Sequence, residues 1–205
     1  MLIIADPSAH GTKGMTEAQQ LRDALGMCDN LEITIVGGKQ LRKIDLLLSL
    51  GEYHLVHYIG QAVFHAQQST RSGWLLHENV LTVSELSQLT RPPLLVFANA
   101  CQDNSTLAGS SEIMSVGRPF DISRAFLRAG AAHYISQICA SHHPGNVAFA
   151  ANFYRHFLQG RSAGTALALA RQNARQSANP NDILWASFVH YGDPTFQLPT
   201  VTTRP

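Results

Sequence analysis

This sequence is poor in charged residues and in cysteine, and both shortages exclude classes of protein. Charged residues make up only 14% of the 205 residues, and they nearly cancel to a net charge of +1. Such a balance gives no basic surface for nucleic acid or for an anionic membrane. The three cysteines are widely spaced and form no CxxC pair, which argues against a zinc or redox motif and for reduced thiols. We therefore expect no metal, no cofactor and no nucleic-acid partner.

Long apolar runs are missing as well. The apolar residues near Met1 are too few for the core of a signal peptide, and no run approaches the length of a membrane helix. Together with reduced thiols, this predicts a cytoplasmic protein that does not contact a membrane. The hydrophobic content of 45% is enough for one sizeable core. Because no repeat or linker divides the chain, we expect a single domain over residues 1–205.

Short apolar runs alternate with amphipathic segments along the chain. The runs cover residues 2–5, 31–36, 53–59, 94–100, 131–138 and 185–191. Residues 16–19 (Thr-Glu-Ala-Gln) and 82–85 (Thr-Val-Ser-Glu) have the form of a capping box and predict two helix starts. We expect the third run to end at Gly60 in a loop that extends past Leu76. Strands that alternate with helices of about a dozen residues predict an α/β fold, with a mostly parallel sheet covered on both faces.

The most apolar run leads directly to a cysteine. Residues 94–100 read Leu-Leu-Val-Phe-Ala-Asn-Ala, and Cys101 follows before the chain turns polar at Gln102. Such a run is typical of a strand buried on both faces of a parallel sheet. In open α/β sheets, ligands and reacting groups gather at the carboxyl ends of the strands. Cys101 is therefore a candidate nucleophile, and a packed thiol is the alternative for any isolated cysteine.

Several segments, taken in order, resemble the CHAT domains, which are relatives of caspases and separase among cysteine peptidases. They are His-Tyr-Ile-Gly-Gln-Ala at 57–62, Ser-Gly-Trp-Leu-Leu at 72–76, residues 93–101, residues 126–131, Phe-Tyr at 153–154, residues 166–171 and residues 185–194. The resemblance implies a caspase-like sandwich and a peptide or protein as substrate or partner. It also implies that a helical-repeat or other regulatory domain accompanies this one, in a separate chain or a removed segment.

The family's catalytic pair is incomplete in this sequence. Cys101 matches the nucleophile, but the family's histidine stands between a glycine and a small residue, where this chain has Gln61. An amide cannot take the thiol proton or protonate the leaving amine. The general acid–base contribution, typically about 10²–10⁴-fold, should therefore be missing. The resemblance places the oxyanion hole at the backbone N–H groups of Ala62 and Cys101.

Other polar residues are weaker candidates for the site. His65, His142 and His143 follow strand ends and are candidates for a substitute base, whereas His54 and His57 should be structural. Asp103 and Asp193 are candidates for a pocket that binds a basic side chain, and the alternative for both is a turn or cap aspartate.

Three interpretations remain open. The chain is a cysteine endopeptidase domain impaired at Gln61, or a pseudoprotease that binds or scaffolds other proteins, or an active protease trapped by an introduced Gln61. A flavodoxin-type domain that binds a small molecule is least favoured, because no phosphate-binding glycine-rich loop follows the first strand.

Overall fold

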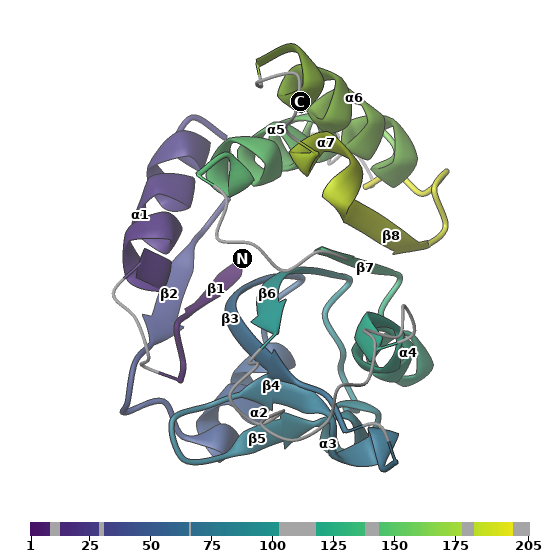
Figure 1. Cartoon of the computed structure of the whole chain (residues 1–205). Coiled ribbons are helices and arrows are strands. Elements are labelled where there is room, and N and C mark those ends of the chain that lie inside the picture. Colours follow the sequence, from purple (N-terminus) through teal and green to yellow (C-terminus); the bar gives the residue numbers. More distant parts are fainter. Residues whose placement is uncertain are drawn as a thin grey trace, which may run out of the picture.

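The computed structural model describes residues 1–8, 13–28, 31–65, 67–102, 118–137, 144–177 and 183–198. In these residues a central sheet of eight strands lies between two layers of helices (Figure 1). The strands are β1 (Leu2–Ala5), β2 (Thr34–Gly37), β3 (Leu55–Val63), β4 (Gly73–Leu75), β5 (Val80–Thr82), β6 (Leu95–Gln102), β7 (His133–Gln137) and β8 (Phe188–Gly192). The helices are α1 (Lys13–Leu25), α2 (Lys43–Leu50), the 3₁₀ turn η1 (Ser69–Arg71), α3 (Val83–Leu86), α4 (Arg118–Ala129), α5 (Asn146–Leu158), α6 (Ala163–Ser177) and α7 (Leu184–Ser187).

The sheet is parallel except at one edge and at a small hairpin. Its order is β2-β1-β3-β6-β7-β8, and only β8 runs antiparallel to its neighbour in this row. The hairpin of β4 and β5 adds to β3 beyond the end of β1. The mostly parallel α/β sheet expected from the sequence is therefore confirmed.

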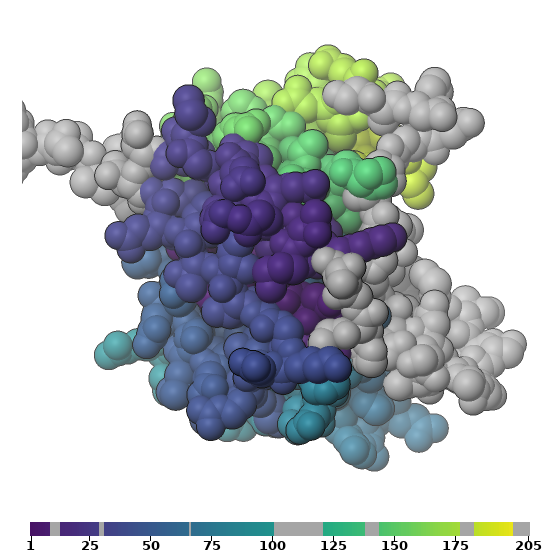
Figure 2. Space-filling model, turned by 90° about the vertical axis from the view of Figure 1, so that its left-hand side faces the viewer, coloured from purple at the N-terminus to yellow at the C-terminus, as the bar shows by residue number. Residues whose placement is uncertain are grey.

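Each face of the sheet carries its own hydrophobic core. Helices α1, α5 and α6 cover one face around Phe97 and Phe153, and helices α2, α3 and α4 cover the other around Tyr58 and Phe126. Neighbouring strand residues point to opposite faces, so β6 must be apolar at nearly every position. Figure 2 shows one side of the molecule, where N-terminal residues in purple and blue lie below the green C-terminal layer.

The third strand is longer than the sequence predicted. We expected it to end at Ile59, with a loop from Gly60, but β3 continues to Val63. The reason is that the last residues of β3 have strands on both sides, since Ala62 pairs with Gln102 of β6 and with Trp74 of β4. The hairpin was itself expected to be a loop, because three-residue strands carry almost no periodic signal.

The two predicted capping boxes had different outcomes. Thr82 and Glu85 form a true capping box at the start of α3, as expected. Helix α1 instead begins at Lys13, three residues before the start expected at Thr16. At the other end of the chain, Trp185 lies in the short helix α7 and not in the final strand. In the part of the chain that the structure describes, no helix is both long and apolar enough to cross a membrane.

Candidate active site

The candidate site lies where two neighbouring parallel strands end. Gln61 on β3 and Cys101 on β6 are Cα partners in the strand register. Neighbouring strands run about 4.8 Å apart, so the two residues are adjacent at the carboxyl edge of the sheet. The structure therefore brings together the two positions that the resemblance assigns to the catalytic pair.

The backbone at Gln61 is held by an aromatic pair beneath it. The Tyr58 hydroxyl donates to the carbonyl oxygen of Gln61 over 2.6 Å, and the Tyr58 ring stacks on Trp74 with centroids 4.2 Å apart and planes 6° apart. A Cβ at Gly60 would lie 2.7 Å from the Tyr58 ring. Glycine is therefore required before Gln61, because any side chain there would push away the tyrosine that holds the Gln61 carbonyl.

The Gln61 side chain is half-buried, and its Oε1 atom finds no hydrogen-bond donor among the described residues. The Oε1 atom itself is buried, and a buried acceptor without a donor costs about 1–3 kcal/mol.

The oxyanion positions are less open than expected. Ala62 is flanked by β4 and β6, and Cys101 pairs with Gln61. Backbone N–H groups inside a ladder ordinarily donate to the next strand. An oxyanion role for Ala62 and Cys101 therefore requires the pairing to open at this end, and it stays a prediction.

Of the candidate substitute bases, the structure describes only His65. It is exposed, two residues beyond the end of β3, and its backbone N–H donates to the Ser72 hydroxyl over 2.9 Å. His142 and His143 lie outside the described residues. His57 is buried between Phe97 and Tyr154, its Nδ1 lies 3.2 Å from the Tyr154 hydroxyl, and burial lowers its pKa to about 3. A histidine that stays neutral inside the core fits the structural role expected for it.

The structure does not bring Asp193 to the site. Its neighbour Gly192 pairs with His133 at the start of β7, level with Leu95, which lies six positions before Cys101 on β6. That is about 20 Å of extended chain. Asp193 is exposed and accepts hydrogen bonds from the Thr195 backbone and hydroxyl, which lower the pKa of its carboxyl. Asp193 therefore fits the alternative given above, an aspartate that stabilises a turn. Asp103 lies outside the described residues.

A chain of buried polar side chains lies at the same edge and was not predicted from the sequence. Asn99 Nδ2 donates to Glu17 Oε1 over 2.5 Å, Asn146 Nδ2 donates to Asn99 Oδ1 over 3.0 Å, and Gln137 Nε2 donates to Asn146 Oδ1 over 2.9 Å. The three amide residues are at most 6% exposed. We call these four residues the amide chain. It links α1, β6, α5 and β7, and the one signal for it in the sequence is a polar Asn99 inside an apolar run.

Glu17 is the charged end of the amide chain. Burial raises the pKa of its carboxyl, and the hydrogen bond from Asn99 partly offsets this shift. In the described part of the chain, no lysine, arginine or histidine forms an ion pair with Glu17. A half-buried carboxylate therefore lies within two strand positions of Cys101 without a cation to neutralise it.

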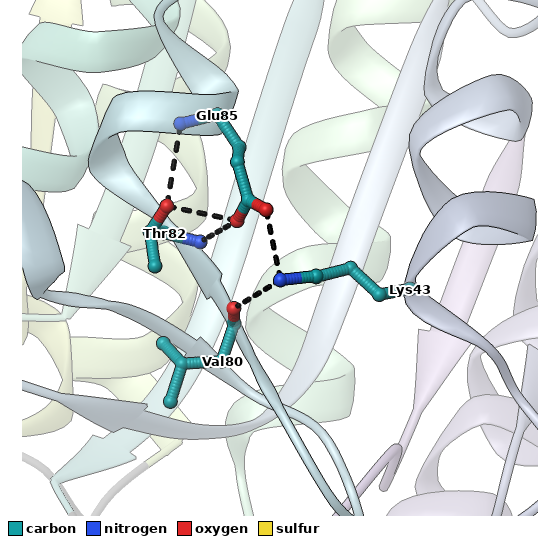
Figure 3. A network of polar contacts seen from close by, with 4 residues as sticks. All are labelled: Lys43, Val80, Thr82 and Glu85. Carbon is teal, nitrogen blue, oxygen red and sulfur yellow. Dashed lines mark hydrogen bonds and ion pairs between the residues drawn. The ribbon is translucent and has the colours of Figure 1, made fainter.

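A second polar network fixes the hairpin on the other side of β3 (Figure 3). Glu85 accepts from the Thr82 backbone and hydroxyl with one oxygen, and its other oxygen lies 2.8 Å from Lys43 Nζ. Lys43 also reaches the Val80 carbonyl over 3.5 Å. Helix α2 thereby holds the hairpin whose Trp74 pairs with Ala62. Among the described residues, no group of three or more histidines, cysteines or carboxylates could hold a metal.

Comparisons with known proteins agree with this geometry. A family model described as the CHAT domain matches residues 7–193. Among solved structures, the chain is similar to the Arg-specific cysteine proteinase gingipain R, with a TM-score of 0.61 and 14% identity; the match covers 96% of this chain and 46% of that one. The chain thus spans about half of that structure, and at this identity the likeness shows the fold alone.

Other similarities are weak. A flavodoxin from Streptococcus pneumonia TIGR4 gives a TM-score of 0.41 and 13% identity, over 72% of this chain and 88% of that one. A pyridoxal kinase from Staphylococcus aureus gives a TM-score of 0.36 and 13% identity, over 83% of this chain and 84% of that one. Neither carries an argument about this chain. The comparison with curated proteins gave no match.

Proposed function

We propose a function from the premise that this chain belongs to the CHAT-domain family and has a caspase-like α/β fold. Residues 1–205 form one cysteine endopeptidase domain in which Cys101 is the nucleophile and Gln61 replaces the catalytic histidine. The observation that carries this proposal is the register, which pairs Gln61 with Cys101 at the carboxyl ends of adjacent parallel strands.

The proposed reaction is acyl transfer. The Cys101 sulfur attacks a peptide carbonyl carbon, the C–N bond breaks, and the amine leaves with a proton while a thioester remains on the enzyme. Water then cleaves the thioester and restores the thiol. Both steps need a group that takes and returns a proton, and an amide at position 61 cannot do so. We therefore propose that the chain turns over slowly or not at all.

The test is to restore the base. Gln61→His supplies an imidazole with an ordinary pKa of about 6.5, close to the working pH. We expect labelling by a cysteine-directed peptide probe to rise by about 10²-fold or more. Gln61→Asn is the matched control, because it changes the side chain without adding a base. A parent chain with an ordinary turnover of about 1–10³ s⁻¹ that vanishes in Cys101→Ala contradicts the proposed impairment.

A pseudoprotease is the second candidate function. The observation that favours it is the amide of Gln61 beside Cys101, because an amide can neither take nor return the proton that turnover requires. A folded Gln61→His variant that stays unlabelled and cleaves no peptide of a diverse library decides for this candidate. Peptide binding by the parent chain, weakened in Gln61→Ala, supports it directly.

We also propose that the site binds a basic side chain of its substrate through Glu17. Support comes from the half-buried carboxylate without a described cationic partner, and from the likeness to gingipain R, an Arg-specific cysteine proteinase. Peptides that differ only by arginine or citrulline at one position test this, since citrulline keeps the shape and loses the charge. Equal binding of both peptides to the parent chain contradicts the proposal, and Glu17→Gln should remove any preference.

A further inference from the structure

The hydrogen bonds of the amide chain all run in one direction. Gln137 donates to Asn146, Asn146 donates to Asn99, and Asn99 donates to Glu17. Asn146 and Asn99 each turn the side-chain oxygen toward one neighbour and the NH₂ group toward the next, and Gln137 turns its NH₂ group toward Asn146. Among themselves, three amides in a row can form equally many hydrogen bonds in the opposite direction, provided that the residue at position 17 can donate.

Glu17 prevents that reversal. An ionised carboxylate has no hydrogen to donate, so Asn99 must turn its NH₂ group toward it. That orientation turns the Asn99 oxygen toward Asn146, which donates to it. Asn146 then turns its own oxygen toward Gln137, which donates in the same way. At the far end, Gln137 Oε1 finds no donor among the described residues, so no described group at that end selects the direction. We propose that Glu17 is a positioning residue whose carboxylate holds the amides of Asn99, Asn146 and Gln137 in a single orientation.

The amide chain touches both strands of the candidate site at the same level. Asn99 lies two residues before Cys101 on β6, and its Cα partner Ile59 lies two residues before Gln61 on β3. A single orientation of the Asn99 amide therefore means a single polar arrangement where β6 presents Cys101. The importance of this arrangement for a reaction at Cys101 rests on the proposed function, but the orientation itself does not.

Stability alone does not account for a carboxylate at position 17. Because burial raises the pKa of Glu17, the fold disfavours its ionised form. Glutamine has nearly the same shape and accepts the same hydrogen bond from Asn99 without a half-buried charge. If an acceptor were all that is needed, glutamine would serve at least as well. Glutamine differs from an ionised glutamate in one property. Its NH₂ group can donate a hydrogen bond, whereas the carboxylate can only accept one.

Side-chain amide NMR signals of the full chain test the proposal, with Glu17→Gln as the variant. In the parent we expect one set of NH₂ signals for Asn99, Asn146 and Gln137. In Glu17→Gln we expect a second set, or broadening by exchange between two orientations, together with a melting temperature no lower than that of the parent. Glu52→Gln is the control, since it makes the same change at an exposed glutamate.

The outcomes are decisive in both directions. One unchanged set of NH₂ signals in Glu17→Gln overturns the proposal. So does a Glu17→Gln variant that melts lower or fails to fold, because Glu17 is then an ordinary stabilising residue. Neither measurement depends on chemistry at Cys101, so both stand if the peptidase function fails.

The link to the site has its own measurement. The alkylation rate of Cys101 by iodoacetamide, read by mass spectrometry of its peptide, should change in Glu17→Gln and not in Glu52→Gln. Doubled amide signals with an unchanged alkylation rate overturn the link between the amide chain and Cys101.

Discussion

The two flanks of the candidate site carry similar four-residue patterns and use them differently. The hairpin flank consists of β4, β5 and α3, and the helix flank consists of α1 and the amide chain. Both contain threonine followed three residues later by glutamate or glutamine, at positions 16–19 and 82–85. On the hairpin flank the pattern caps a helix, and Glu85 is bonded to Thr82 and Lys43. On the helix flank, α1 begins before Thr16, and Glu17 reaches across the sheet edge to Asn99.

The difference lies in whether the polar groups satisfy one another. Both oxygens of Glu85 have partners, one in the capping box and the other on Lys43. The amide chain instead ends in two acceptors, Glu17 and Gln137, and Gln61 adds a third nearby. A closed network stabilises its flank, whereas Gln137 Oε1 and Gln61 Oε1 are buried acceptors without a described donor, which costs stability. We therefore expect changes on the hairpin flank to act through stability, and changes on the helix flank to act through the site as well.

The largest expected loss of stability comes from a substitution that separates the hairpin from β3. A Cβ at Gly73 would lie 2.0 Å from the Leu81 carbonyl oxygen, and this backbone atom cannot move without breaking the hairpin. Gly73→Ala should lower the free energy of unfolding by about 3 kcal/mol, measured by urea denaturation. Gly26→Ala is the control, because the added Cβ would lie 3.4 Å from its nearest neighbour atom. Equal stabilities of the two variants contradict the prediction.

The next largest loss of stability is expected from a substitution that breaks the amide chain at its centre. Asn99→Ala removes the donor to Glu17 and the acceptor of the Asn146 amide. We expect a loss of about 2 kcal/mol in the free energy of unfolding, since buried polar groups lose their partners. Gln88→Ala, which removes an exposed amide, should change it little. A loss at Asn99 no larger than the loss at Gln88 shows that the amide chain contributes nothing to stability.

Much of this fold can be predicted from the sequence because its strands are continuous apolar runs. The run before Cys101 and the carboxyl-edge position of that cysteine follow from pattern and topology alone. The capping box at Thr82 is equally local, since Thr82 and Glu85 are three residues apart. Most features that depend on neighbours within a few residues therefore agree with the structure, and the helix start expected at Thr16 is the exception.

The missed features depend on residues far apart in the chain. Glu17 and Asn99 are 82 residues apart, and no periodic pattern connects them. Strand β3 continues past Gly60 because β4 and β6 pair with it, which a local reading of a glycine as a loop start cannot include. Asp193 illustrates the same limit, since the antiparallel direction of β8 takes it to the opposite edge of the sheet.

A smaller effect removes the cap of the hairpin flank. Glu85→Ala takes the acceptor from the Thr82 backbone and the partner from Lys43. We expect a loss of about 1 kcal/mol in the free energy of unfolding, because a lost cap dominates and a partly exposed ion pair adds little. Glu78→Ala is the control, as Glu78 is exposed between β4 and β5. If Glu85→Gln is as stable as the parent, the ion pair with Lys43 contributes nothing.

The smallest effect is a pH dependence of opposite sign on the two flanks. For Glu85, burial pushes the pKa up, but the hydrogen bonds from Lys43 and Thr82 outweigh it, so the pKa lies below its ordinary value of 4.5. Its contribution to stability is therefore present above pH 4.5 and is lost as the pH falls through the lowered value. For Glu17 the pKa is raised, so its ionised form costs stability at neutral pH. That cost disappears as the pH falls through the raised value toward 4.5.

Thermal melts of Glu17→Gln and Glu85→Gln beside the parent, from about pH 3 to pH 7, separate the two contributions. At neutral pH we expect Glu17→Gln to melt at or above the parent and Glu85→Gln to melt below it. As the pH falls, both differences should shrink, because a protonated glutamate and a glutamine are both neutral. The Glu17 difference should close first, since its pKa lies above 4.5 and that of Glu85 lies below it. Two differences of the same sign at neutral pH would mean that the two glutamates play the same part.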